Sequence, residues 1–185
     1  MSWWAWTLLV VVLLVVIVGG WYLSSTAGRL DRLHRRVDTG EVALDRALLE
    51  RTSVAGEVAA ARMPDPALAA VIGDAVHTAR RTDPGDLLQR SLAESNLTAA
   101  LGAAFDEPDA LAECRAYPGG AELIGDLESA TRRVQLSRTF LNDAVRACRD
   151  VRYQWLVRVF RLAGHTPWPE PFEMDDTPPA GFGIR

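Results

Sequence analysis

The first 28 residues contain no charged side chain, and this stretch constrains the chain more than any other feature of the sequence. From Trp3 to Leu23 the residues are apolar apart from one threonine and two glycines. A helix over these residues rises about 1.5 Å per residue and reaches roughly 30 Å, which matches the hydrocarbon thickness of a bilayer. We therefore expect a transmembrane anchor over residues 3–25. Aromatic residues lie at both of its ends, as is typical of membrane–water interfaces: Trp3, Trp4, Trp6, Trp21 and Tyr22.

A cleaved secretory signal is the alternative interpretation of this segment. Ser25, Thr26 and Ala27 offer a small-x-small cleavage site after the apolar run. A signal peptide begins with a basic region, however, and no lysine or arginine precedes Trp3. The length of the run and its aromatic ends also fit an uncleaved span better. We therefore favour the anchor.

Positive charge follows the anchor directly. The stretch from 29 to 36 contains a single acidic residue, Asp31, and four basic ones: Arg29, Arg32, Arg35 and Arg36. Because basic residues next to a span favour the cytoplasmic side, we expect a single-pass protein of the cell membrane with its N-terminus outside and its helical domain in the cytoplasm. The arginines also allow contact with anionic headgroups.

The composition after the anchor indicates one domain and excludes a nucleic-acid binder. The remaining residues, about 155 of them, suffice for a single core. The net charge is −4, whereas nucleic-acid-binding domains are strongly basic. All 20 basic residues are arginine, a bias typical of GC-rich bacterial genomes. We expect a helical domain over residues 29–165 and a proline-rich irregular tail over residues 166–185. Trp168, Pro171 and Phe172 are the candidates for docking the tail back on the bundle, and its last dozen residues are expected to be flexible.

Apolar residues recur at three- and four-residue steps through this domain, which predicts helices and no strands. The first helix is expected to continue from the span to residue 62, with Gly40 as a soft spot that costs about 1 kcal/mol relative to alanine. Arg51 interrupts its apolar face. Asp65 followed by Pro66 predicts the start of a helix that ends near Arg81.

Later helices are predicted from similar signals. Asp83 and Pro84 predict a helix to Phe105, with a buried stripe composed of Leu87, Leu88, Leu92, Leu97 and Leu101. Pro108 bends or restarts the helix, and residues 117–120 form a strong turn. A long final helix is expected from there to Gly164. Its coiled-coil-like seam has members seven residues apart: Val134, Leu141, Cys148, Trp155 and Leu162.

No residue pattern points to a catalytic, cofactor or metal site. His34, His77 and His165 lack metal-ligand spacing, and the two cysteines, Cys114 and Cys148, form no C-x-x-C pair. Glu94, Glu122 and Glu128 are interpreted as solvated helix faces. The arginines of the last helix are likewise interpreted as a solvated face, with pairing to acids such as Glu122 and Asp126, or contact with an acidic partner, as the alternatives. Without lysine, P-loop and Schiff-base chemistry are excluded. We predict no catalytic, cofactor-binding or metal residues and no enzymatic activity.

The order of several landmarks resembles the LemA family of bacterial membrane-anchored helical proteins. The matching residues are Leu30, Leu33, Val37, Asp38, Leu44, Leu48 and Arg51 in the first helix, then Glu94, Asn96, Leu97, Leu101, Tyr117, Pro118, Leu127, Glu128 and Val134, then the R-x-x-x-N-x-A-V set Arg138, Asn142, Ala144 and Val145, and in the tail Pro171, Phe172 and Glu173. The chain is similar to a divergent, actinobacterial-type member, because Leu141 replaces the family's usual tyrosine. The resemblance implies a helical bundle on a single N-terminal anchor, and scaffold or adaptor roles without catalytic residues.

The sequence therefore predicts an all-α protein with a single N-terminal transmembrane helix followed by an elongated antiparallel bundle of long helices. We expect a membrane-anchored scaffold or adaptor of the LemA type, whose partners are the membrane and either another protein or a second copy. No nucleic acid, cofactor or small-molecule substrate is expected. The alternatives are a small-ligand-binding or enzymatic helical domain at the membrane, and a signalling or stress adaptor that bends at Gly40.

Overall fold

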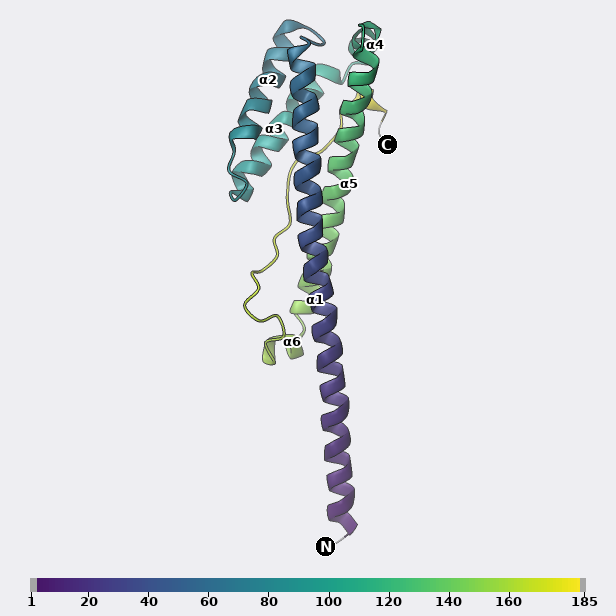
Figure 1. The fold of residues 1–185 in the computed structure, drawn as a ribbon, viewed down its shortest axis with the longest axis vertical. Helices are drawn as coiled ribbons and strands as arrows, with labels where there is room; N and C mark the ends of the chain where they lie inside the picture. The colour runs from purple at the N-terminus through teal and green to yellow at the C-terminus, as the bar shows by residue number, and fades with distance from the viewer. Residues whose placement is uncertain (1–2, 184–185) are drawn as a thin grey trace. The chain divides into compact units, whose positions relative to one another are not determined.

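The chain is all-helical over residues 3–183, which are the residues that the computed structural model describes (Figure 1). No strand occurs among these residues, so the predicted fold class is confirmed at this level. The helices are α1 (Trp3–Ala60), α2 (Pro66–Arg81), α3 (Leu87–Phe105), α4 (Pro108–Ala116), α5 (Gly120–Arg152) and α6 (Trp155–Val159), and a 3-10 turn, η1, covers Ala180–Phe182.

The chain divides into two compact units, and α1 and α5 each contribute to both. We call residues 3–39 with 143–170 the N-terminal unit, and residues 40–142 with 171–183 the core unit. The N-terminal unit therefore holds the apolar half of α1, the end of α5, and α6. The core unit holds α2, α3, α4 and the last part of the tail.

Local capping chemistry explains where α2 and α3 begin. Asp65 caps α2 as predicted, since its carboxylate accepts hydrogen bonds from the backbone N–H groups of Ala67 (2.7 Å) and Leu68 (3.2 Å). The predicted start of α3 at Asp83 is wrong. Asp83 instead accepts from the N–H of Gly85 at 2.8 Å within a turn, and Asp86 caps the helix by accepting from the N–H of Gln89 at 3.0 Å.

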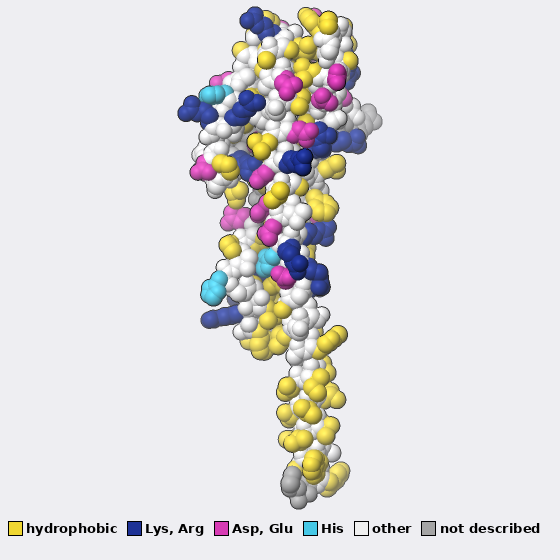
Figure 2. All heavy atoms as spheres, in the orientation of Figure 1, with side chains coloured by type: hydrophobic (Ala, Val, Ile, Leu, Met, Phe, Trp, Pro, Cys, Tyr) yellow, Lys and Arg dark blue, Asp and Glu magenta, His cyan; other side chains and the backbone are white. Residues whose placement is uncertain are grey.

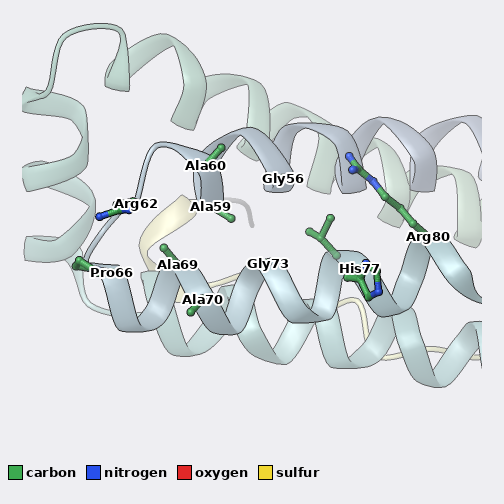
Figure 3. Close-up of a pocket in the computed structure, with 11 residues that line it drawn as sticks. Gly56, Ala59, Ala60, Arg62, Pro66, Ala69, Ala70, Gly73, His77 and Arg80 are labelled. Carbon is green, nitrogen blue, oxygen red and sulfur yellow. The ribbon is translucent and has the colours of Figure 1, made fainter.

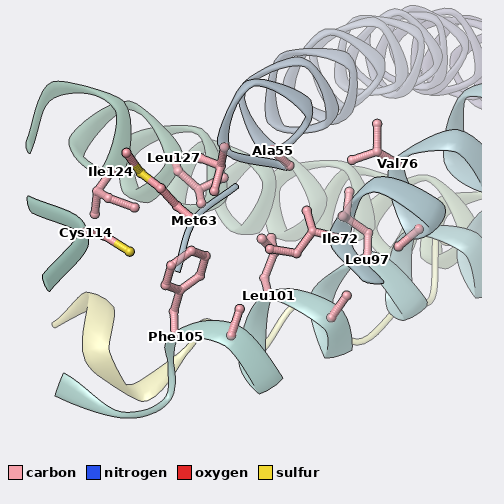
Figure 4. Packing of buried hydrophobic residues seen from close by; sticks show 14 of the residues in the cluster. Ala55, Met63, Ile72, Val76, Leu97, Leu101, Phe105, Cys114, Ile124 and Leu127 are labelled. Carbon is pink, nitrogen blue, oxygen red and sulfur yellow. The ribbon is translucent and has the colours of Figure 1, made fainter. Parts of the chain in front are cut away.

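The hydrophobic core of the core unit is built from every helix in it (Figure 4). Phe105 at the end of α3 is fully buried and stacks 5.8 Å from Phe182 of η1, centroid to centroid. The other labelled members in Figure 4 come from all five helices of the core unit and the segment after α1: Ala55, Met63, Ile72, Val76, Leu97, Leu101, Cys114, Ile124 and Leu127. Five helices and the tail therefore share one core.

The predicted buried stripe of α3 is only half correct. Leu97 and Leu101 are buried, whereas Leu87, Leu88 and Leu92 are 42%, 67% and 50% exposed. At about 100° per residue, Leu88 and Leu97 point to opposite sides of the helix, because nine residues separate them. Small residues replace the leucines on the buried face, chiefly alanines such as Ala93, Ala100 and Ala104.

The long final helix is shorter than predicted. Val134, Leu141 and Cys148 are buried as expected for its seam, but α5 ends at Arg152 and Trp155 is 69% exposed. Gln154 is non-helical, with φ −60° and ψ 132°, and breaks the helix before α6 begins. The seam therefore does not extend to Trp155.

The tail has little regular structure, as predicted, but its last dozen residues are not loose. Phe172, Met174 and Phe182 are 4%, 9% and 5% exposed. Arg138 of α5 donates two hydrogen bonds of 2.8 Å to the carboxylate of Asp176. The predicted flexibility is therefore wrong for residues 174–183, and residues 184–185 lie outside the described part. The buried apolar side chains of the tail and the bidentate ion pair between Arg138 and Asp176 explain why the tail packs against the helices.

Gly40 is not the soft spot that the sequence predicts, because α1 runs through it and buries it. A Cβ atom at Gly40 would lie 3.2 Å from the Cα and 3.3 Å from the Cδ1 of Leu141 in α5. Glycine therefore permits a close approach of the two helices at this point. A bending adaptor centred on Gly40 has no support in this geometry.

We predict that Gly40→Ala destabilises the protein by about 1 kcal/mol, because the overlap with the Leu141 backbone outweighs the gain in helix propensity. Gly125→Ala in α5 is the matched control, since a Cβ there meets nothing within 4 Å. This control should gain up to about 1 kcal/mol. Urea unfolding of both variants in detergent checks the pair, and an equal gain for both would contradict the close packing.

Candidate membrane-contact surface

The N-terminal half of α1 presents apolar side chains on all sides. α1 is long and apolar enough to cross a membrane, and none of its most apolar 18-residue window is buried against the rest of the protein. Each residue from Leu8 to Val18 is more than half exposed. Figure 2 shows this part of the chain covered by hydrophobic side chains. A core helix of a soluble protein is buried, so that interpretation of the segment is excluded.

Helix α6 adds a second apolar surface to the N-terminal unit. It lies beside α1 in Figure 1, and Trp155, Val159 and Phe160 are 69%, 64% and 53% exposed. A groove of about 660 Å³ lies between the two helices and contains no charged side chain. Its lining residues are Leu14, Val15, Val18, Gly19, Tyr22 and Leu23 of α1, with Trp155, Leu156, Val159 and Phe160 from α6 and its end.

Sequence reasoning missed this groove because it placed Trp155 on the seam of one long helix. The composition of the residues after Arg152 was the available sequence signal for an exposed apolar surface. Six of the eight residues from Tyr153 to Phe160 are aromatic or branched apolar, with Val157 alone among them buried. A coiled-coil seam needs only two apolar residues per heptad, so this density exceeds what packing within a bundle requires.

Arg152 closes the base of the loop that contains α6. Its guanidinium donates to the carbonyl oxygens of Pro167 (2.6 Å) and Thr166 (2.9 Å) and lies 4.8 Å from the ring centroid of Trp168. Arg149 donates to the carbonyl oxygen of Pro169 at 2.8 Å. Residues 153–165 therefore leave and rejoin the end of α5 at one clamped point.

The arginines of α5 are not simply a solvated face, as the sequence predicts, and among the described residues they do not use the alternative partners Glu122 and Asp126 either. Besides the two clamp arginines, Arg133 pairs with Glu50 of α1 at 2.7 Å, and Arg138 pairs with Asp176 of the tail. Glu122 is exposed, and no ion pair joins it or Asp126 to these arginines among the described contacts. Three of the six arginines of α5, Arg138, Arg149 and Arg152, bind the returning tail, which sequence spacing alone does not reveal.

Arg51 and Glu94 form a buried ion pair, which corrects the interpretation of Glu94 as a solvated side chain. The side chains are 1% and 6% exposed, and an Arg51 Nη2–Glu94 Oε2 hydrogen bond of 2.7 Å joins them. Arg51 also donates to Thr98 Oγ1 at 3.0 Å, while its Nε has no hydrogen-bond partner among the described residues. The pair links α1 to α3 with no access for a substrate.

The remaining acids and cysteines offer no reactive group. Glu128 is half-buried and pairs with Arg115. Cys114 and Cys148 are free and buried, and burial raises the pKa of each thiol, which favours the unreactive protonated form. No group of three or more potential metal-ligating side chains occurs within residues 3–183.

The three histidines lie apart. His165 is exposed, and His34 is half-buried with Nε2 3.4 Å from Arg152 Nη1. Burial, followed by the charge of Arg152, lowers the pKa of His34. His77 belongs to an open groove of about 710 Å³ between the end of α1 and α2 (Figure 3). Its walls are mostly glycine and alanine, with Arg62 and Arg80 as basic side chains, so it is shallow and lacks a carboxylate or nucleophile.

Comparison with known proteins gave no match: no family model matches the chain, and neither a curated protein nor a solved structure matches it. The chemistry of the candidate surface therefore rests on its own geometry.

We predict that Glu94→Gln destabilises the protein by roughly 3–5 kcal/mol, since it leaves the Arg51 charge buried without its counter-ion. Glu50→Gln, which breaks the exposed pair with Arg133, is the control and should cost about 1 kcal/mol or less. The double variant Arg51→Met/Glu94→Leu should recover most of the loss. Urea unfolding measures all three, and equal losses for the two glutamates would contradict burial as the cause.

We predict that the clamp at Arg152 weakens as the pH falls below about 6.5, the usual pKa of histidine. The pKa of His34 is lowered in the folded protein, so on lowering the pH the unfolded form becomes protonated before the folded form does. The contribution of neutral His34 to the stability of the fold is therefore complete above about pH 6.5 and is lost as the pH falls below it. Hydrogen exchange of the backbone amides of 153–168 at pH 7.5 and 5.5 measures the effect. His34→Asn should remove it and His165→Asn should not; persistence in the His34 variant would refute the assignment.

Proposed function

We propose that this chain is a membrane-anchored helical scaffold or adaptor, with residues 3–25 spanning the bilayer. The observation that carries the proposal is the apolar half of α1, in which every side chain from Leu8 to Val18 is more than half exposed. Burying a single leucine or valine contributes roughly 1.5–3 kcal/mol, so the eleven residues from Leu8 to Val18 favour lipid over water by roughly 15–30 kcal/mol. This exceeds the stability of a typical domain.

The proposed orientation places the N-terminus outside and the rest of the protein in the cytoplasm of a bacterial cell. Its support is the cluster of four arginines directly after the span, at positions 29, 32, 35 and 36, all of them exposed. One of them, Arg35, pairs with Asp31, the only acid within the cluster. Three net positive charges remain, which is the bias that the positive-inside rule describes.

An adaptor role rests on what the helices present. Exposed apolar side chains on three helices outside the span, Val42, Leu49, Val71 and Leu136, offer surface for a protein partner or a second copy. Tethering raises the effective concentration at the membrane, so a weak surface suffices. The proposal includes an elongated antiparallel bundle and membership of the LemA family. The landmark residues from Arg138 to Val145 support the family membership.

Binding of a small anionic ligand is the second candidate function. The observation that favours it is the groove in Figure 3, where Arg62, His77 and Arg80 line an open space of about 710 Å³. Inorganic phosphate is the probe, and calorimetry of the full chain against Arg80→Gln tests it. Phosphate binding that is abolished by Arg80→Gln would support an anion-binding function of the groove. The absence of a heat change with both proteins would contradict it.

We predict that the full-length protein stays in the membrane fraction after extraction with alkaline carbonate, because the apolar segment spans the bilayer. The intact mass of the membrane-bound protein should include residues 3–27. A mass that corresponds to cleavage after Ala27 would show that the segment is a signal peptide and would overturn the anchor.

Topology is read in the same preparation. Protease added to sealed inverted vesicles should digest the domain, whereas protease added to right-side-out vesicles should spare it. Replacing the four arginines with glutamine should weaken this asymmetry, and the matched control replaces four α5 arginines distant from the span in sequence. An unchanged asymmetry in the first variant would contradict the role of the cluster.

A further inference from the structure

Three features of the molecule could support a further role: the groove beside α6, the small-residue groove between α1 and α2, and the buried Arg51 cluster. The second is lined mostly by alanine and glycine with basic side chains at its edge, and no described lining residue has a buried, unpartnered side-chain polar atom. The third is closed to solvent. The groove beside α6 is the feature whose lining and position along α1 indicate what occupies it.

The position of this groove along α1 places it at membrane depth if the anchor spans the bilayer. Its wall on α1 runs from Leu14 to Leu23, which are the second half of the apolar segment. At about 1.5 Å per residue this wall is roughly 14 Å long, about the hydrocarbon depth of one leaflet. Helix α6 therefore lies alongside α1 within a leaflet and not beyond it.

The contacts of Arg152 with the tail fix the position of α6 beside α1. Arg152 lies beside His34, eleven residues after the last groove residue of α1, Leu23. This separation corresponds to roughly 16 Å along the helix. From there residues 153–160 extend back along α1 toward the apolar segment, and the chain returns to the carbonyl contacts of Arg152 at Thr166 and Pro167. A loop clamped at its base holds α6 against the span.

The side chains around α6 have the composition of an interfacial membrane segment. Trp155, Val159 and Phe160 are exposed in spite of their apolar surface, and Tyr153 is 65% exposed. Two exposed arginines, Arg158 and Arg161, accompany them. Arginine at the edge of an apolar segment extends its guanidinium to the headgroup level, while tryptophan and tyrosine favour the interface.

We propose that α6 is a second membrane contact and that the groove between α6 and α1 holds an acyl chain of a phospholipid, with Arg158 and Arg161 at headgroup phosphates. This inference rests on the proposed anchor and deepens it. Lipid is the occupant that the observations favour, because the groove wall is continuous with the apolar surface of the span and offers no charged side chain to a protein partner. The arginines complement the negative phosphate.

The test uses the full chain in vesicles of phosphatidylcholine and phosphatidylglycerol, with an environment-sensitive fluorophore on a single introduced cysteine. Both native thiols are buried, so they do not compete for the label. Val159→Cys reports on the groove. Val11→Cys reports on the span, and Leu136→Cys in α5, which is 63% exposed, is the control outside it. Doxyl-labelled lipid quenches fluorophores in lipid, and iodide quenches those in water.

We expect doxyl lipid to quench the labels at 159 and 11 severalfold more than iodide does, and the reverse at 136. Quenching of the 159 label by iodide alone, with the 11 label in lipid, overturns the second contact while the anchor stands. Iodide quenching at both positions overturns the anchor itself. A label at 159 that neither reagent quenches shows that protein covers the groove, such as a second copy, and overturns the lipid assignment.

Two glycines allow a matched test of the groove itself. A Cβ at Gly19 or at Gly20 meets nothing within 4 Å, but only Gly19 lines the groove. Gly19→Leu should fill the space and reduce doxyl quenching of the 159 label about twofold, whereas Gly20→Leu should leave it unchanged. Equal effects of the two variants would overturn an acyl chain in the groove.

Discussion

The absence of charge from the first 28 residues is the constraint on which the rest of the structure depends. A helix that is apolar on every side has no stable place in water, and within the described residues every side chain from Leu8 to Val18 stays more than half exposed. The remaining features follow from this one. The arginine cluster marks where the apolar surface ends, and the clamp at Arg152 returns the chain toward it.

Stability of the core unit depends on different interactions. Its core is made of side chains from five helices and η1, and Arg51 and Glu94 join α1 to α3 inside it. A buried ion pair of this kind contributes little net stability, yet losing one partner is costly. It therefore acts as a constraint on which faces of α1 and α3 meet. Outside the core, Arg138 of α5 adds polar interactions by binding Asp176 of the tail.

Local sequence signals predicted much of this structure, and contacts between distant segments account for most errors. Asp65 and Pro66 identify the start of α2 because a cap is a short-range interaction. The long apolar helix and the buried seam of α5 follow from composition and periodicity. Glu94 was misinterpreted because its partner, Arg51, lies 43 residues away. Docking of the tail through Phe172 agrees with the prediction, but the packing of residues 174–183 was missed because Asp176 and Arg138 are likewise distant. The groove was missed because the break at Gln154 has no proline or glycine.

The most direct test of the central claim is hydrogen–deuterium exchange of the full-length protein in lipid nanodiscs. The claim is that the N-terminal unit contacts the bilayer through both the apolar half of α1 and α6. The account predicts very slow exchange of the amides from 8 to 18, and slower exchange of the amides from 155 to 160 in nanodiscs than in a detergent-free polymer that leaves no lipid. Fast exchange over 8–18 in nanodiscs would contradict the account, because a helix in hydrocarbon has no water with which to exchange.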